Sequence, residues 1–299
     1  MYHCQQKNPR LRQMQNHYPV YWINLNRDIE RRHRMTWALE TGGWEHYRWE
    51  GVDATDLRQK FWPLPRLWQA GTALPGLRRK TERDPFRSTA RTELACLASW
   101  QTLLEHLNEK KTLSDWFLVM EDDVGSSLAC PNSWPFSLSQ LVKSINKSAL
   151  VVQLAPISSN ARIQLHSYYT NTNGEKLAIP KMNVKSHGNG AVLINSRALP
   201  FLQRHLGKWI HNRWRHIHLL SHPHATRPVA DKWLYACIPA NRCWVCTYPI
   251  FCLEAKTSNI HQKHVDSYHS PSKMTTLDIW KEDKASLMIE SFRYWETIQ

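Results

Sequence analysis

The feature that most constrains the fold is an apolar run that leads directly into three acidic residues. Residues 116–120 (WFLVM) form a short run rich in strand-forming side chains, which predicts a buried strand. Glu121, Asp122 and Asp123 then follow at the carboxyl end of that strand. In an open α/β sheet this is the edge where ligands bind, so the sequence predicts a binding site there.

Three neighbouring carboxylates repel one another and lose hydration when buried, unless a positive group lies among them. A divalent cation such as Mg²⁺ or Mn²⁺ suits oxygen ligands of this kind and can bridge the phosphates of a nucleotide. The alternative interpretation is a solvated acidic turn after a strand. The tripeptide alone does not decide between the two.

The beginning of the chain has the strand–helix–strand order that opens a nucleotide-binding α/β layer. Residues 18–25 predict a strand, and apolar positions at 29, 35 and 39 predict a helix that ends at Gly42 and Gly43. Residues 44–49 predict a second strand. Asn24, Arg27 and Asp53 would then face one cleft, where Asp53 would accept hydrogen bonds from a ribose or base, unless it only starts a turn.

Further elements follow in an order that suits the same fold. Residues 89–108 predict a helix that leads into the acidic strand, and residues 150–154 predict another buried strand. Gly188 and Gly190 precede a strand that runs to residue 195, and they would let the backbone approach a ligand or simply form a turn. Asp231 starts a helix, and from the residues alone a helix N-cap is favoured over a catalytic base.

Charge and cysteine content narrow the classes of partner. The net charge of +14 favours anionic partners. The basic residues are scattered, however, without a zinc-finger spacing or an aromatic RNA-binding motif, so we expect no nucleic-acid partner. The seven cysteines form no regular framework, and we expect buried free thiols.

Several segments have no clear periodicity. Residues 1–17 predict a disordered N-terminal arm, and residues 55–88 predict a long loop rich in Pro, Arg and Trp. Residues 207–224 indicate a basic surface, residues 156–186 resist assignment, and the last twenty residues predict a surface helix.

The N-terminal residues lack the apolar core of a secretory signal, and no apolar run reaches the length of a membrane span. We therefore expect a cytoplasmic protein. Its positive charge would allow peripheral contact with the inner membrane.

Six segments, taken in order, resemble glycosyltransferase family 25, which contains lipopolysaccharide glycosyltransferases and the collagen galactosyltransferases. They span most of the chain, and their combination is more specific than any one of them. The segments are VYWINLNR at 20–27 with ERR at 30–32, TELACLASW at 92–100, FLVMEDDV at 117–124, GNGAVLI at 188–194, PVAD at 228–231 and SNI at 258–260.

The resemblance implies a GT-A-like, Rossmann-like fold: a single-domain α/β protein with a mixed sheet flanked by helices. It places the domain at residues 18–265, after the arm at 1–17 and before a C-terminal helical extension at 266–299. The implied activity is transfer of a sugar, with inversion, from a UDP-sugar donor to a hydroxyl of a glycan or lipopolysaccharide acceptor. The name of the collagen enzymes makes galactose one candidate sugar.

The resemblance also implies roles for individual residues. Asp123, with Asp122 and His261, would hold Mn²⁺ or Mg²⁺, with His264 as a substitute for His261, and Asp231 would be the general base. The nucleotide-sugar would be bound by a larger set, namely Asn24, Leu25, Arg27, Asp53, Glu93, Glu121, Asp122, Gly188 and Gly190.

The chain departs from the family pattern on the helix at 92–100. Family members often have a glycine and a histidine there, where this chain has Ala95 and Trp100. Two other functions remain open at this point. One is a non-catalytic carbohydrate-binding protein on the same fold, which would use its tryptophans. The other is a metal-dependent phosphoesterase or nuclease, although that class usually carries more His and Asp ligands.

Overall fold

The fold is built around one mixed sheet of seven strands. The computed structural model describes residues 18–54, 91–110, 114–206, 209–210, 213–214, 229–254 and 265–298. The predicted arm at 1–17, the loop at 55–88, almost all of the basic surface at 207–224, and both His261 and His264 lie outside the described residues.

Both strands and helices are short to medium in length. The strands are β1 (Val20–Asn24), β2 (His46–Glu50), β3 (Trp116–Glu121), β4 (Val151–Gln153), β5 (Ala178–Pro180), β6 (Ala191–Asn195), β7 (Trp209–Ile210), β8 (Arg213–Trp214) and β9 (Cys243–Cys246). The α-helices are α2 (Ile29–Gly42), α5 (Arg91–Glu109), α6 (Leu138–Ser144), α7 (Ser159–Thr170), α8 (Leu199–Leu206), α10 (Ala230–Cys237), α12 (Ser270–Glu282) and α13 (Ser286–Thr297).

The order of the strands explains why ligand-binding residues gather at one edge. The sheet runs β2-β1-β3-β6-β4-β9-β5, and β7 pairs only with β8 in a separate hairpin. β1 is parallel to β2 and β3, so these three strands end at the same edge. β6 is antiparallel to both β3 and β4, so β6 begins at the edge where they end.

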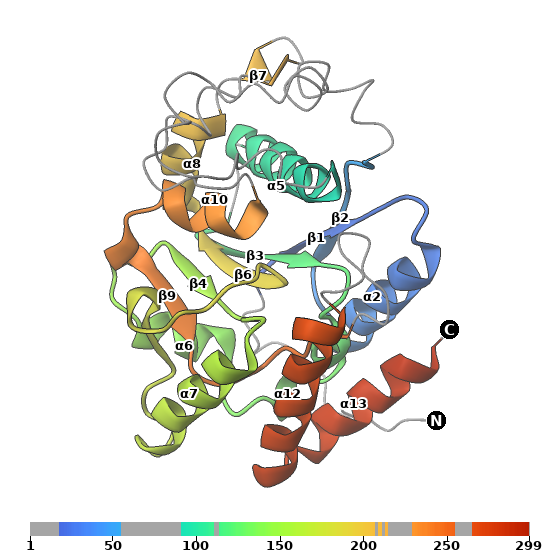
Figure 1. Ribbon diagram of the computed structural model, residues 1–299, viewed down its shortest axis with the longest axis vertical. Coiled ribbons are helices and arrows are strands. Elements are labelled where there is room, and N and C mark those ends of the chain that lie inside the picture. The colour runs from blue at the N-terminus through green and yellow to red at the C-terminus, as the bar shows by residue number, and fades with distance from the viewer. Residues whose placement is uncertain are drawn as a thin grey trace.

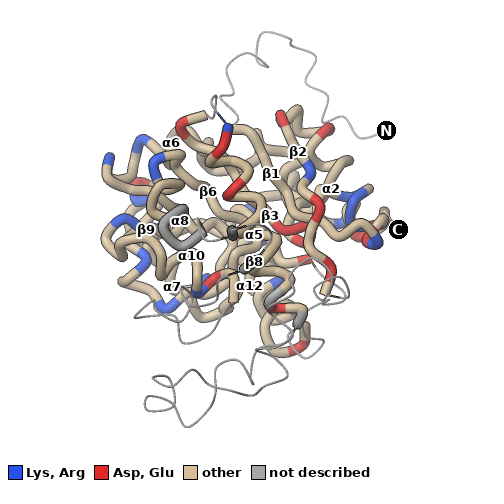
Figure 2. The backbone as a smooth tube through the Cα atoms, turned by 90° about the horizontal axis from the view of Figure 1, so that it is seen from above, with Lys and Arg blue, Asp and Glu red and all other residues tan. Residues whose placement is uncertain are grey.

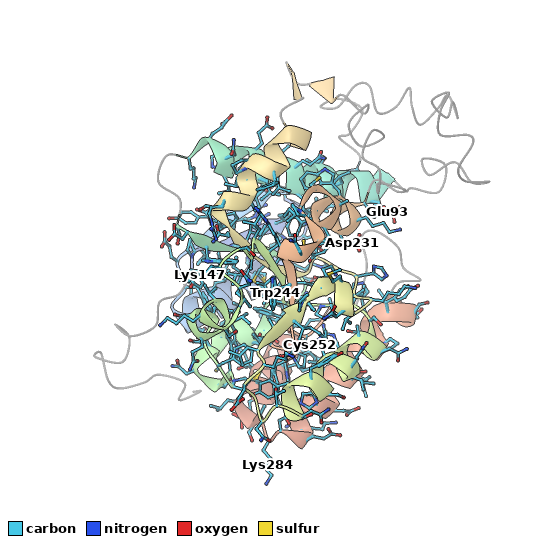
Figure 3. The ribbon with its side chains drawn as sticks, turned by 90° about the vertical axis from the view of Figure 1, so that its left-hand side faces the viewer. Glu93, Lys147, Asp231, Trp244, Cys252 and Lys284 are labelled. Atoms are coloured by element: carbon cyan, nitrogen blue, oxygen red, sulfur yellow. The ribbon has the colours of Figure 1, made fainter. Side chains whose placement is uncertain are left out.

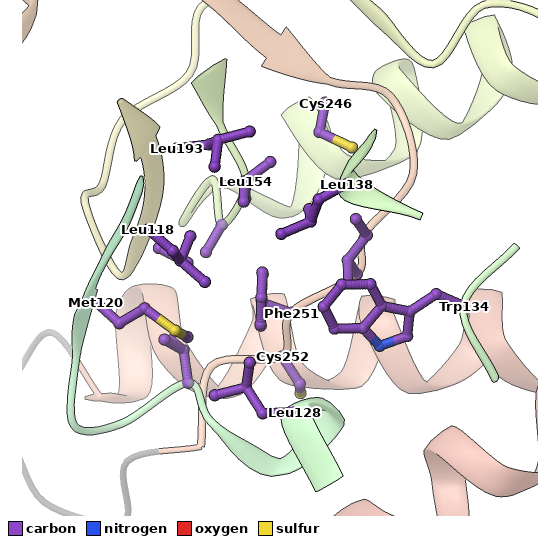
Figure 4. Packing of buried hydrophobic residues seen from close by; sticks show 14 of the residues in the cluster. Leu118, Met120, Leu128, Trp134, Leu138, Leu154, Leu193, Cys246, Phe251 and Cys252 are labelled. Atoms are coloured by element: carbon purple, nitrogen blue, oxygen red, sulfur yellow. The ribbon is translucent and has the colours of Figure 1, made fainter. Parts of the chain in front are cut away.

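Helices cover both faces of the sheet (Figure 1), with α5, α8 and α10 on one face and α2, α6, α7, α12 and α13 on the other. The first face is packed by aliphatic side chains of α5 and α8 against β3 and β6. The second face has a larger core that contains Met120, Leu193 and Phe251 (Figure 4). The apolar alternation along β3 supplies both cores, because Phe117 and Val119 lie in the first and Leu118 and Met120 in the second.

The mixed α/β sheet flanked by helices, predicted from the sequence, is confirmed. The predicted elements at 29–43, 89–108, 116–121 and 150–154 agree with the structure to within a few residues. The Gly43 prediction is confirmed as well, because its φ of 72° is left-handed and its N–H caps the carbonyls of α2. The cysteines among the described residues are free, and all but Cys96 are buried.

The segment at 156–186, for which the sequence predicts no element, contains α7 and β5. The burial of a charged residue, Arg162, inside α7 had hidden the amphipathic pattern. After β6, Asn195 caps a 3₁₀ turn by accepting a hydrogen bond from the Arg197 N–H (3.0 Å).

The C-terminal helices are integral to the second core. Trp280 and Trp295 are both fully buried, and Met288 and Phe292 join the same cluster. The expectation of a surface helix over the last twenty residues is therefore wrong for one face of α13. The sequence hid this because the apolar positions alternate closely with charged ones.

Lys and Arg positions lie on several sides of the backbone, around α2 and around β9 and α7 (Figure 2). This agrees with the scattered charge of the sequence. In the described ranges, no helix combines the length and the apolar character that crossing a bilayer requires.

We expect Trp280→Ala to lower the free energy of unfolding by about 3–5 kcal/mol, because it empties a fully buried indole site. It also removes the hydrogen bond from Trp280 Nε1 to the Pro249 carbonyl (2.8 Å). Met274→Ala on the same helix is the control, since Met274 is 54% exposed and should change stability by about 0.5 kcal/mol at most. Equal effects in urea denaturation would contradict the packing of α12 as a core element.

Candidate functional site

A cavity of about 450 Å³ lies at the edge of the sheet where β1 and β3 end and β6 begins. Its volume falls in the range of about 300–1,000 Å³ that is typical of small-molecule sites. Several chain segments form its walls, among them the end of β1 with the start of α2, the first half of α5, the acidic run at the end of β3, the loop at 187–190, and the start of α10. Glu93 of α5 and Asp231 of α10 lie on the same side of the molecule in Figure 3.

Asp122 is buried at the floor of this cavity and has partners for both oxygens. Asn24 Nδ2 donates to Oδ2 (2.7 Å), and Arg31 donates to Oδ1 (2.9 Å). Burial raises the pKa of Asp122, although Arg31 and Asn24 favour its charged form. Burial in turn lowers the pKa of Arg31, but Asp122 and Asp123 outweigh it, and the net pKa of the guanidinium is raised. The pair therefore behaves as a charged anchor between β3 and α2.

Asn24 ties this anchor to the second strand. Its Oδ1 accepts hydrogen bonds from Arg32 (3.3 Å) and Arg48 (3.0 Å), and its Nδ2 also donates to the Asp28 carbonyl (3.1 Å). The amide is thus fully engaged within the protein. A contact between the Asn24 side chain and a nucleotide would displace one of these bonds. In this structure the side chain positions Asp122, and its predicted contact with the nucleotide-sugar stays a prediction.

Glu121 faces α5 instead of Asn24. Trp100 Nε1 donates to Glu121 Oε1 (3.0 Å), and the Cys96 thiol approaches the same atom (3.6 Å). Burial, together with Asp123, raises the pKa of Glu121 to about 7. Trp100 therefore acts as a hydrogen-bond donor to the acidic run.

Asp123 differs from its two neighbours, because its Oδ1 is buried and has no hydrogen-bond partner among the described residues. Its carbonyl accepts from the Glu254 N–H (2.8 Å), which fixes the backbone at this point. Asp123 therefore has an oxygen available to a ligand, whereas both oxygens of Asp122 are bound.

Asp123 is thus the acid that fits a Mg²⁺ or Mn²⁺ ion, which commonly takes one or two protein carboxylates together with substrate phosphates. Within the described ranges, no three His, Cys, Asp or Glu side chains converge on one point. Asp122 would first have to release Arg31 or Asn24. The metal roles predicted for Asp122 and His261 stay predictions.

The loop at 187–190 is held rigidly by its backbone. The Ile157 N–H donates to the His187 carbonyl (2.8 Å), Gln153 Nε2 donates to the Gly188 carbonyl (2.7 Å), and the Glu121 N–H donates to the Gly190 carbonyl (2.9 Å). Gly188 has a φ of 102°, and a Cβ at Gly190 would lie 2.8 Å from a Val124 methyl carbon. Gly188 is therefore favoured by its backbone conformation and Gly190 by its close contact with the Val124 side chain, and both line the cavity.

Three hydrogen-bonded side chains, those of Lys181, Gln153 and Ser186, support the loop at 187–190. Lys181 donates to Gln153 Oε1 (2.7 Å) and to Ser186 Oγ (2.8 Å), and Ser186 Oγ donates to the same Gln153 oxygen (2.7 Å). Burial lowers the pKa of Lys181 to about 8. These side chains set the position of the Gly188 peptide.

Asp231 is not a helix N-cap, because Val229 occupies the cap position and Asp231 lies in the first turn of α10. Its Oδ1 accepts from the Lys232 N–H (2.8 Å), and its Oδ2 accepts from the Gly188 N–H (3.2 Å). The second bond crosses from α10 to the loop at 187–190. Each oxygen keeps a further lone pair, and the residue lines the cavity.

Of the remaining predicted residues, all but one line the cavity. Leu25, Arg27 and Glu93 line the cavity with the residues above, whereas Asp53 does not line it and instead forms an ion pair with Arg27. A ribose contact would have to compete with that pair. Four polar lining residues were not predicted. Asn189 lies between the two glycines of the segment at 188–194, and the other three belong to no motif: His187, Tyr268 and His269.

Comparisons with known proteins add little to this geometry. No protein-family model matches the chain, and no curated protein sequence does. Among solved structures, the apo form of mouse xyloside xylosyltransferase 1 superposes with a TM-score of 0.33 and 7% sequence identity, covering 74% of this chain and 80% of that one. A structural similarity this low carries no conclusion about the function of this chain.

We expect Glu121→Gln to remove a pH dependence of stability. In the folded chain the carboxyl keeps its proton up to about pH 7, against 4.5 as its ordinary pKa, so its contribution is complete below pH 4.5 and is lost as the pH rises through 7. At about 1.4 kcal/mol per pKa unit, the wild-type chain should lose roughly 3–4 kcal/mol relative to the variant across this window.

The measurement is the free energy of unfolding in urea at several pH values from 4.5 to 8. Glu175→Gln, at an exposed position, is the control and should run parallel to the wild-type chain. Parallel curves for Glu121→Gln as well would show that the Glu121 carboxyl is not protonated in the folded protein.

Proposed function

We propose that this chain is a glycosyltransferase that moves a sugar from a UDP-sugar to a hydroxyl of a glycan or lipopolysaccharide acceptor, with inversion. The observation that carries the proposal is the position of Asp231. Its carboxylate lies on the wall of the same cavity as the acidic run after β3, and two backbone N–H groups orient it. The family 25 resemblance of the sequence supports the same reading.

In the proposed reaction, Asp231 accepts the proton of the acceptor hydroxyl. The electron pair that this leaves on the hydroxyl oxygen attacks the anomeric carbon of the donor from the face opposite the diphosphate. The bond between that carbon and the diphosphate oxygen breaks, and UDP leaves with the electron pair. A general base at the attacking hydroxyl is typically worth about 10²–10⁴ in rate.

Positive side chains of the cavity suit a diphosphate. Arg27 and Arg31 lie on the wall formed by the end of β1 and the start of α2, and Lys232 follows Asp231 on α10. Arg27 is bound to Asp53 and Arg31 to Asp122, so both guanidinium groups are oriented before a ligand arrives. Preoriented cations of this kind stabilise charge that develops on a leaving group.

The proposed cofactor is Mn²⁺ or Mg²⁺, held by Asp123 together with the donor phosphates. Asp123 suits this role because its Oδ1 has no partner in the described part of the chain. When bound, the ion would neutralise charge on the departing diphosphate.

Thermal unfolding against a panel of UDP-, GDP-, CMP- and ADP-sugars, with and without Mn²⁺, tests donor and cofactor together. We expect UDP-sugars to raise the melting temperature, with a larger shift in Mn²⁺, because a ligand that binds only the folded state stabilises it. Asp123→Asn should abolish the extra shift. An Mn²⁺ effect that persists in Asp123→Asn would exclude Asp123 as the ligand.

A lack of response to every nucleotide would favour the carbohydrate-binding alternative, and glycan binding would then be measured directly. Cleavage of a phosphodiester substrate would instead support the phosphoesterase class.

Asp231→Asn tests the base. We expect kcat for sugar transfer to fall by about 10²–10⁴, while the affinity for UDP stays within about twofold, because the amide keeps the shape but cannot take the proton. Asp278→Asn on α12, whose side chain is 59% exposed, is the matched control and should leave kcat unchanged. Transfer at the wild-type rate by Asp231→Asn would contradict the role of Asp231.

A further inference from the structure

Asn189 carries a buried amide with no hydrogen-bond partner on either atom. The residue is 5% exposed, and among the described residues neither Nδ2 nor Oδ1 is paired. An unpaired buried polar group costs about 1–3 kcal/mol, so few such groups persist without a reason. The other buried amides near the cavity are bound, as Asn24 and Gln153 show.

The side chain cannot easily be explained as loosely placed, because its backbone is fixed on both sides. The carbonyls of His187, Gly188 and Gly190 each accept a hydrogen bond from a different element. The amide is therefore held in the wall of the cavity that Asn189 lines.

Its position lies between the two halves of the proposed site. Met120 pairs with Ala191 in the antiparallel ladder, and the Glu121 N–H bonds the Gly190 carbonyl, so the same register continued by one residue brings Asn189 beside the acidic run. On its other side, the N–H of Gly188 donates to Asp231. In the proposed reaction, the group that spans the distance between the diphosphate and the base is the transferred sugar.

We propose that Asn189 binds two neighbouring hydroxyls of the transferred sugar, one donating to Oδ1 and the other accepting from Nδ2. This inference rests on the proposed function. An amide suits a pair of adjacent hydroxyls because it offers an acceptor and a donor side by side. When such a sugar is bound, both amide atoms gain hydrogen bonds, and the desolvation free energy of the unpaired amide is offset.

The arrangement makes Asn189 a specificity residue. A site that hydrogen-bonds a substrate hydroxyl rejects the analogue that lacks it, because the buried amide is then left unpaired. We therefore expect poor binding of donors that lack one hydroxyl of the pair, relative to the full sugar.

The test compares UDP with UDP-glucose and UDP-galactose as probes, by calorimetry in Mn²⁺. Asn189→Leu keeps the branched shape of the side chain and removes its polar atoms. We expect its affinity for UDP to stay within twofold of the wild-type value, while the preferred UDP-sugar loses about tenfold. Asn183→Leu, at an exposed position away from the cavity, is the control and should change neither affinity.

A second readout separates a binding role from a structural one. Because Asn189→Leu removes an unpaired buried amide, the ligand-free variant should unfold at the same temperature as the wild-type chain or higher. A lower melting temperature together with unchanged affinities would assign the amide a structural role and overturn the inference.

The outcomes also separate the two proposals. Equal losses for UDP and UDP-sugar would place Asn189 against the nucleotide and overturn the sugar assignment alone. A sugar preference that survives in Asn189→Leu would do the same. If the wild-type chain binds neither probe while remaining folded, the proposed function itself fails.

Discussion

The site depends on how the carboxylate of Asp122 is held out of water. Burial alone would disfavour the charged form of Asp122. The carboxylate is stabilised in place because Asn24 and Arg31 each bind one of its oxygens. That one residue joins the end of β3 to the end of β1 and the first turns of α2. The opposite wall is joined in the same way, because Asp231 links α10 to the loop that precedes β6. The cavity is thus framed by two carboxylates that also fix the backbone around it.

A division of labour follows among the three consecutive acids. Asp122 is bound on both oxygens, Glu121 is bound by Trp100 and its pKa is raised by burial, and Asp123 keeps an oxygen without a partner. Residues of one chemical type, adjacent in sequence, therefore serve as anchor, neutral acid and available ligand. Their environments, set by different neighbouring elements, separate them.

Much of the framework could be predicted from the sequence because it depends on local patterns. The apolar run at 116–120 and the double glycine at 42–43 specify a strand and a helix end without tertiary information. The placement of Asp231 beside the acidic run was implied only by the family resemblance, because the residues alone favoured a helix N-cap. The partners of Asp122 could not be predicted, because Arg31 is 91 residues away and was one basic residue among many. Asn189 could not be predicted either, because it is singled out by the lack of hydrogen-bond partners for its amide among the described residues, which only the structure shows.

The turn after the acidic run connects the cavity to the distant C-terminal helices. A Cβ on Gly125 would lie 2.3 Å from the sulfur of Met35 and 2.8 Å from the ring of Trp295, so α2 and α13 close tightly around this turn. During synthesis, the core on that face stays open until residue 295 has left the ribosome. The strands that form the cavity are synthesised earlier, and their apolar surface on that face stays exposed until then. Removal of Trp295 by truncation would therefore leave open the core that backs the turn after the acidic run.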